Sequence, residues 1–202
     1  DDWIIEGGKT FVTNAPIADV LIIFASTAEP GKSRGFGGGI TAFLVETDMP
    51  GVEVGPPIHK MGLRTSPMAE VRLDSGRGPI SAILGRKNQG AASFSSEMDW
   101  ERSCLFACHL GAMVRQLEVC IQYAKDRKQF GQAIGKYQSV AHRIAEMKMR
   151  IEVARPLLYK VGWLKDQGKR AVLEAAIAKL YVSEAYVASS LDAVRIHGGY
   201  GY

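Results

Sequence analysis

One acidic residue, Glu101, lies where a carboxylate could act as a general base. It falls in the middle of a predicted helix, in the run of residues 94–110, where helical spacing places it on the same apolar stripe as Phe94, Met98, Leu105 and Cys108. A carboxylate among apolar side chains is costly unless it is paired or functional, and proton abstraction is the functional interpretation. A salt-bridged glutamate at a subunit interface explains the pattern equally well. The neighbouring Arg102 is spaced to pair with Asp99 at i,i+3.

A basic segment with an aromatic residue, residues 125–131, ends the same predicted helix. Cations at a helix C-terminus interact favourably with the macrodipole, so spacing alone favours a solvated capping turn. The alternative is a phosphate contact, in which Arg127 donates two hydrogen bonds and Phe130 packs on a ring.

A glycine-rich segment, residues 197–202, follows the last predicted helix. Glycines allow the backbone to approach a ligand closely and expose amide donors, but an ordinary helix C-cap has the same composition. Because no strand precedes it, this segment is not the strand–turn–helix fingerprint of dinucleotide-binding domains.

The three cysteines, Cys104, Cys108 and Cys120, form no CxxC pair. With His109 they lack the spacing of a metal site, and we interpret them as buried structural thiols. Three cysteines in 202 residues also cannot form a disulfide scaffold, which indicates reduced thiols in a reducing compartment. Bacterial cytoplasm and mitochondrial matrix both satisfy that condition.

The elements that must position these residues differ between two parts of the chain. Residues 1–84 contain short apolar runs at spacings typical of strands, with a two-residue turn at Gly7-Gly8 and a glycine-rich loop over residues 29–39. Residues 85–202 show helical periodicity over 88–127, 137–165 and 170–196, with Pro156 expected to kink or split the second helix. The sequence predicts an α+β fold, an antiparallel β-barrel or sandwich domain (1–84) followed by a long-helix bundle (85–202).

Composition excludes several classes of protein. Hydrophobic residues make up 47% of the chain, which excludes a disordered segment. No uninterrupted apolar run approaches about 20 residues, so we expect no membrane span. The net charge of +4 is spread along the chain and argues against a nucleic-acid partner. Residues 1–5 look like the middle of a strand, and we expect a fragment cut at both ends.

Several runs together resemble the acyl-CoA dehydrogenase family over nearly the whole chain. In order along the sequence they are WIIEGGKTFVTN at 3–14, MGLR at 61–64, DRKQFG at 126–131 with YQ at 137–138, AKL at 178–180 with Glu184, and IHGGYG at 196–201. The resemblance implies a central β-domain followed by a four-helix domain, a bound FAD and an acyl thioester substrate.

The resemblance also assigns cofactor contacts. Phe11, Val12 and Thr13 match the segment beside the isoalloxazine ring, and Phe11 stands where many members have Trp. The adenine and pyrophosphate contacts, usually to a neighbouring subunit's flavin, match Arg127, Gln129, Phe130 and Gln138, with Gly198 and Gly199 closing that site. Arg195 stands where the family usually has Gln and could pair with the pyrophosphate. A shared site implies a homo-oligomer, most often a tetramer.

Glu101 matches the catalytic base of the isovaleryl- and long-chain-type branches, whereas most members carry that glutamate further downstream. Asp99 and Arg102 match acyl-CoA contacts. The implied reaction is α,β-dehydrogenation of an acyl-CoA or carrier-bound acyl group, with electrons passing to an electron-transferring flavoprotein or another acceptor. The alternatives are an oxidase or monooxygenase on the same fold, dehydrogenation of a carrier-bound group such as prolyl, or a non-catalytic DNA-binding member.

Overall fold

The computed structural model describes residues 2–28 and 39–202. Contacts divide the chain into two compact units, Asp1–Ser95 and Ser96–Tyr202, each described here by itself. The boundary falls inside a helix, so the domain boundary expected at residues 84 and 85 stays a prediction. Apart from Gly39, the glycine-rich loop predicted over residues 29–39 lies outside the described residues.

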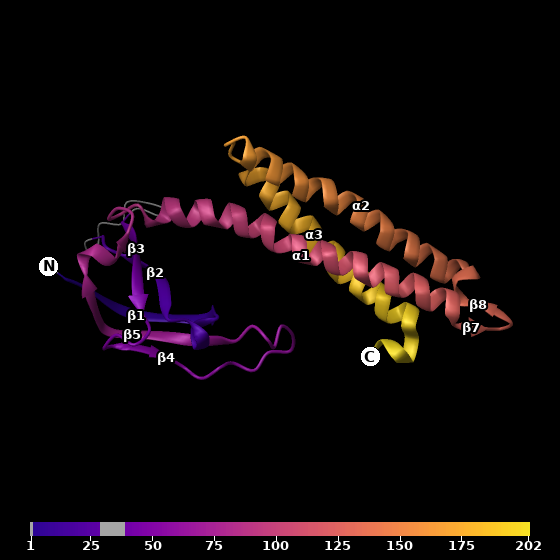
Figure 1. The fold of residues 1–202 in the computed structure, drawn as a ribbon, viewed down its shortest axis with the longest axis horizontal. Coiled ribbons are helices and arrows are strands. Elements are labelled where there is room, and N and C mark those ends of the chain that lie inside the picture. Colours follow the sequence, from indigo (N-terminus) through magenta and orange to yellow (C-terminus); the bar gives the residue numbers. More distant parts are fainter. Residues whose placement is uncertain (1, 29–38) are drawn as a thin grey trace. The chain divides into compact units, whose positions relative to one another are not determined.

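The first unit consists of two antiparallel sheets (Figure 1). One has the order β1 (Asp2–Thr13), β5 (Met68–Pro79) and β4 (Val52–Val54). The other has the order β2 (Val20–Ser26), β3 (Ile40–Glu46) and β6 (Ile83–Leu84). Two short 3₁₀ turns, Ala15–Ile17 and Ile80–Ala82, lie between strands.

Alternation along the strands builds the core of this unit. In β2, Leu21 and Ile23 are buried whereas Ile22 between them is exposed, as expected for a strand with one face in the core. The buried cluster takes side chains from both sheets, namely Trp3, Ile5, Leu21, Ile23, Phe43, Val45, Ala69, Val71 and Leu73. The unit is therefore a sandwich; the described strands form no closed barrel.

The predicted turn at Gly7-Gly8 is wrong. β1 continues through both glycines and pairs with β5 along its length, with a register shift between Ile5 and Gly7. A φ of 140° at Gly7 accommodates the irregularity, which glycine tolerates because it has no Cβ. The glycines thus mark a bulge within one strand rather than the end of a hairpin.

Three long helices form the second unit: α1 (Gly90–Asp126), α2 (Gln138–Asp166) and α3 (Val172–His197). A small hairpin of β7 (Lys128–Gln129) and β8 (Gln132–Ala133), followed by a 3₁₀ turn (Ile134–Lys136), joins α1 to α2. α2 runs without interruption through Pro156, so the expectation that this proline splits the helix is wrong. The observed strands and helices confirm the predicted α+β fold class.

Small residues allow the three helices to approach closely. The buried cluster mixes large side chains of α1 and α2, such as Met113 and Met147, with alanines of α3, such as Ala175 and Ala178. Large side chains opposite small ones fill the space between helices without voids.

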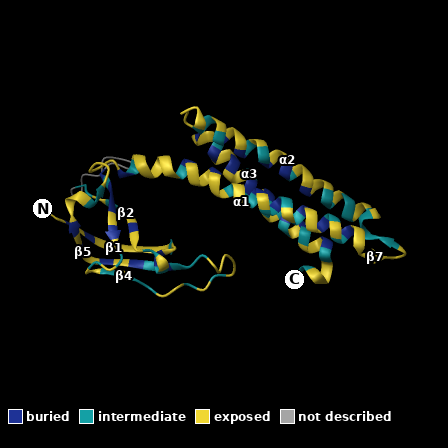
Figure 2. Cartoon of the chain, in the orientation of Figure 1, coloured by how far each residue is buried: buried dark blue, intermediate teal, exposed yellow. Residues whose placement is uncertain are grey.

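α1 carries two apolar faces, and only one is buried. The buried face follows helical spacing, in steps of three, four or seven residues, as Asp99, Ser103, Leu110, Met113, Leu117, Cys120 and Ala124. The second face holds Leu105, Cys108 and Val119, which remain exposed in this chain, and the first half of α1 is largely yellow in Figure 2.

These two faces explain why α1 is long and apolar enough to cross a membrane by length and composition, with a mean hydropathy of 1.4 over 18 residues. A core helix gives the same signal, and the expected absence of a membrane span stays a prediction.

Candidate active site

Glu101 lies in the N-terminal third of α1 on its uncovered face. The side chain is exposed, as are those of Leu105 and Cys108, while Met98 is partly buried. The predicted helix face therefore exists, but the described residues of the chain do not bury it. The expectation of a carboxylate sunk in an apolar environment is wrong for this chain by itself, because the faces of α1 that pack on α2 and α3 lie elsewhere.

Asp99 lies on the opposite, buried face of α1 and pairs across the helix interface. Its Oδ2 is 3.5 Å from Nζ of Lys165 on α2, and that ammonium lies 5.4 Å from the centre of the Trp100 ring. The ion pair expected between Asp99 and Arg102 is not observed; the Arg102 side chain is exposed. Buried charges need a partner, and Lys165 is the one that reaches Asp99. Asp99 Oδ1 is buried with no hydrogen-bond partner among the described residues.

The segment Phe11–Thr13 ends β1 in an irregular conformation. A second register shift against β5 falls between Lys9 and Val12, and Phe11 has a φ of 59° with its ring 66% exposed. Left-handed backbone is costly for a bulky residue and tends to persist where function requires it. Val12 is partly buried on the sandwich core, whereas Phe11 and Thr13 face outward.

The segment after α1 folds into a tight hairpin that displays Phe130. Phe130 and Gly131 both have positive φ, 50° and 82°, the geometry of a two-residue turn between β7 and β8. The Phe130 ring is 92% exposed. The Tyr137 hydroxyl donates to the carbonyl oxygen of Gln129 at 3.0 Å and thereby fixes the hairpin to the start of α2.

The glycine turn after α3 lies at the same end of the helical unit as this hairpin (Figure 1). The Tyr123 hydroxyl donates to the carbonyl oxygen of His197 at 3.3 Å, and the two rings stack 4.4 Å apart. Gly198 has a φ of 58°, and a Cβ added there or at Gly199 would meet open space. The structure therefore brings the exposed Arg127, Gln129, Phe130 and Gln138 to the same end as Gly198 and Gly199.

A cluster that the sequence analysis missed joins α2 to α3 at this end. The carboxylate of Asp192, only 3% exposed, lies 2.8 Å from Arg143 Nη1, 2.7 Å from Arg150 Nη1 and 3.4 Å from Arg195 Nη1. Burial would raise the pKa of Asp192, but hydrogen bonds from Arg150 and Arg143 outweigh it and hold the pKa below its usual value. The available signal was the i,i+7 spacing of Arg143 and Arg150, which places both on one helix face.

These features fit a flavin dinucleotide. Two aromatic side chains, Phe11 and Phe130, are held outward by strained backbone and offer flat surfaces to rings. Arg127 and Arg195 are exposed cations of the kind that pairs with a pyrophosphate, and the turn at Gly198 leaves open space beside the backbone. Phe11 belongs to the first unit and the other residues to the second, so their assembly into one cofactor site stays a prediction.

The cysteines do not form a metal site within the described part of the chain, where no group of three or more His, Cys, Asp or Glu side chains could hold an ion. Cys104 and Cys108 are exposed, so the interpretation of all three thiols as buried is wrong for these two. Cys120 is buried in the helical core; burial, with Asp192 as the smaller cause, raises the pKa of its thiol.

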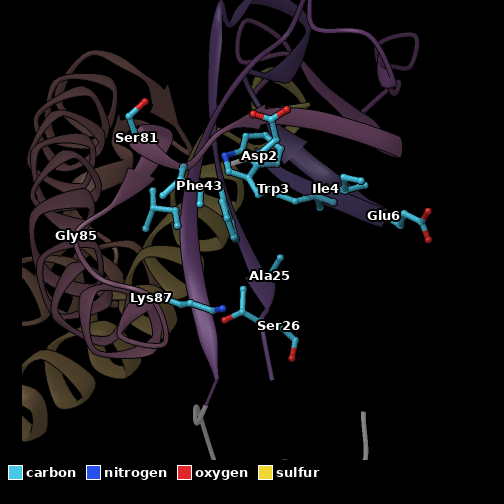
Figure 3. Close-up of a pocket in the computed structure, with 14 residues that line it drawn as sticks. Asp2, Trp3, Ile4, Glu6, Ala25, Ser26, Phe43, Ser81, Gly85 and Lys87 are labelled. Atoms are coloured by element: carbon cyan, nitrogen blue, oxygen red, sulfur yellow. The ribbon is translucent and has the colours of Figure 1, made fainter. Parts of the chain in front are cut away.

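A large cavity in the first unit, about 920 Å³, contains none of the predicted site residues. Figure 3 shows Trp3, Phe43 and Lys87 among the side chains that line it. Cavity size alone therefore does not locate the predicted chemistry.

Comparison with known proteins identifies the family. The model of the acyl-CoA dehydrogenase middle domain matches residues 1–75, and that of the C-terminal domain matches residues 88–202. The chain belongs to the acyl-CoA dehydrogenase family, which confirms the resemblance seen in the sequence.

The relatives most similar to this chain include enzymes acting on carrier-bound prolyl groups. An L-prolyl-[peptidyl-carrier protein] dehydrogenase of Pseudomonas fluorescens is 46% identical over 197 residues, which cover 98% of this chain and 51% of the relative. The structure of the prolyl acyl carrier protein oxidase AnaB has a TM-score of 0.96 at 47% identity, covering 100% of this chain and 52% of that one. The structure of an FAD complex of PigA has a TM-score of 0.94 at 44% sequence identity, covering 98% of this chain and 51% of that one. The chain thus spans about half the length of the relatives it matches.

Proposed function

We propose that the protein containing this chain is an FAD-dependent enzyme that dehydrogenates an acyl thioester between its α- and β-carbons, with Glu101 as the catalytic base. The observation that carries the proposal is the position of Glu101: an exposed carboxylate on the uncovered, largely apolar face of α1, in a member of this family.

The environment of Glu101 suits an acyl chain. Met98, Leu105 and Cys108 lie on the same helix face as the carboxylate and offer apolar contacts to a ligand there. A thioester covering this face would exclude water from the carboxylate.

The chemical roles divide between protein and cofactor. Glu101 accepts the α-proton on a carboxylate oxygen, and the electron pair left on the α-carbon forms the new double bond as a hydride leaves the β-carbon. FAD, when bound, supplies the acceptor for that hydride. The exposed Arg102 is the proposed substrate contact and is placed to meet an anionic group of the substrate. Asp99 is buried against Lys165 on the opposite face of α1, so its predicted contact with the substrate is not supported by its position in this chain.

Substitution of the proposed base tests this assignment. In the full-length protein, Glu101→Gln should lower kcat by about 10²–10⁴-fold, the usual contribution of a general base, with FAD still bound. Glu97→Gln, an exposed acid one turn earlier on α1, is the matched control and should retain activity. Near-normal turnover by Glu101→Gln would refute the assignment.

A carrier-bound prolyl thioester is the substrate that we favour over an acyl-CoA. Support comes from the two proteins with the highest identities reported above, both named for carrier-bound prolyl groups. Rapid-mixing reduction of the flavin with prolyl-carrier protein, prolyl-CoA and a straight-chain acyl-CoA separates the classes. Faster reduction by a straight-chain acyl-CoA would contradict the carrier-bound assignment.

Oxygen is the second candidate for electron acceptor, beside an electron-transferring flavoprotein. It is favoured by the likeness to a structure named as an oxidase. Substrate-dependent oxygen consumption, compared with reduction of a dye that replaces the flavoprotein, distinguishes an oxidase from a dehydrogenase.

The distance along α1 supports a shared site between copies of the protein. Glu101 and the end of α1 are 25 residues apart, about 37 Å at 1.5 Å per residue, which is longer than one FAD can bridge. The Arg127 end of one subunit and the Glu101 region of another would then serve the same flavin. We therefore propose a homo-oligomer, with a tetramer as the expected state.

A further inference from the structure

Asp192 divides its contacts between a buried side and an exposed side. Oδ2 accepts a hydrogen bond from Arg150, which is 17% exposed and is paired in turn with Glu146 at 3.2 Å. Oδ1 meets Arg143 and Arg195, which are 39% and 58% exposed. The buried contact of Oδ2 with Arg150 links α2 to α3. The contacts of Oδ1 hold two guanidinium groups, those of Arg143 and Arg195, close together at the surface.

The exposed side lies beside the residues proposed to hold the cofactor. Arg195 precedes the Gly198 turn by three residues, and Arg143 follows Gln138 by five, so each is about one helical turn from a predicted contact. Three arginines face two carboxylates, Asp192 and Glu146, which leaves one positive charge in excess.

We propose that Asp192 is a positioning residue for the cofactor: it restrains the guanidinium of Arg195 in the last turn of α3, before the Gly198–Gly199 turn, as a contact for the pyrophosphate of FAD. This inference rests on the proposed function, from which it takes the identity of the cofactor. Arg143 shares Oδ1 with Arg195 and adds a second positive charge at the same surface.

A flexible arginine restrained in this way binds an anion with less loss of side-chain freedom. Unrestrained, an exposed arginine samples many rotamers, and fixing it on binding costs affinity. The 3.4 Å contact with Asp192 limits those rotamers before the cofactor arrives, without neutralising the guanidinium fully because Asp192 is shared.

FAD affinity of the full-length apoprotein tests this proposal without reference to catalysis. Quenching of flavin fluorescence gives the Kd for wild type, Arg195→Gln, Asp192→Asn and the double variant. Arg195→Gln should weaken binding about tenfold or more, the size of one charge-assisted hydrogen bond. It should also reduce the sensitivity of Kd to salt. Arg170→Gln, an exposed arginine before the opposite end of α3, is the control and should bind as wild type.

The double-mutant cycle separates positioning from a purely structural role. If Asp192 acts through Arg195, Asp192→Asn weakens FAD binding severalfold in the wild-type background and by less than about twofold once Arg195 is Gln. An equal loss in both backgrounds would overturn the proposal, as would wild-type affinity in Arg195→Gln.

Asp192→Asn leaves Arg150 without its buried partner and could prevent folding. Asp192→Glu then replaces it in the cycle, because the longer acid keeps the charge for Arg150 while moving the carboxylate relative to Arg195. Its smaller loss of affinity should likewise vanish when Arg195 is Gln, and a loss that persists contradicts the proposal. Failure of the FAD-loaded enzyme to oxidise any thioester would refute the proposed function but not this coupling.

Discussion

At the scale of single residues, the two aromatic residues among the predicted cofactor contacts share an uncommon backbone conformation. Phe11 and Phe130 both have positive φ, and both rings are exposed. For an aromatic residue that conformation costs free energy, of order 1–3 kcal/mol, which the surrounding bulge and hairpin must supply. Both residues remain exposed in the described chain, so packing within the chain does not offset this cost. Packing of each ring against a bound cofactor would offset it.

Asp192 gives a pH-dependent prediction at this scale. Because its pKa is lowered in the folded state, the carboxylate stabilises the fold above its unfolded pKa of about 3.8 and loses this effect as pH falls through the lower folded value. The difference in urea midpoint between wild type and Asp192→Asn should therefore be large at pH 5 and shrink below pH 3.8. Glu118→Gln, which breaks an exposed pair with Arg115, should show little difference at either pH. A difference between wild type and Asp192→Asn that is independent of pH would contradict this assignment.

At the scale of elements, β1 packs closely on β5 because Gly78 of β5 has no side chain. The Trp3 ring lies over Gly78, where an added Cβ would come within 2.3 Å of a ring carbon. Trp3 is buried and its ring is 5.3 Å from that of Phe43, so it cannot move without disturbing the second sheet.

Alanine at Gly78 should therefore destabilise the sandwich. We expect Gly78→Ala to cost about 1–3 kcal/mol, the usual penalty for overpacking. Gly76→Ala on the same strand is the control, because an added Cβ there meets its nearest neighbour at 3.4 Å, ordinary contact. Chemical denaturation followed by tryptophan fluorescence measures both, and equal stabilities would contradict the proposed role of Gly78.

At the scale of the whole molecule, the predicted site residues belong to two units with separate cores. Phe11–Thr13 lie on the first unit, and Arg127, Arg195 and the Gly198 turn lie on the second. In the homo-oligomer that we propose, the two ends of α1 would serve different flavins.

Because the chain spans about half the length of the relatives it matches, we expect residues 1–202 alone to bind FAD weakly or not at all. The full-length protein should purify yellow, with flavin absorbance near one equivalent per chain, whereas this chain expressed alone should purify colourless. Circular dichroism should show that the shorter chain retains its helices, so that lost binding is not lost folding. Tight flavin in the shorter chain would contradict this prediction.

Sequence periodicity by itself predicted the strands and helices, because each is defined by a local pattern of apolar residues. The strands at 20–26 and 40–46 and the three helices follow from alternation and from three-to-four spacing, and the family follows from short motifs in order. The glycines at positions 7 and 8 were misread because a turn and a bulge use the same residue type, and only pairing with β5 distinguishes them.

Tertiary structure decided which face of each helix is used. α1 has two apolar faces, and periodicity cannot tell which one packs on α2 and α3, so Glu101 was expected on a buried face and lies on an exposed one. The Asp192 cluster joins residues 42 to 49 positions apart, and Asp99 pairs with a lysine 66 positions away. Such contacts depend on how helices cross, and that crossing is set by the fit of many side chains rather than by any local run of sequence.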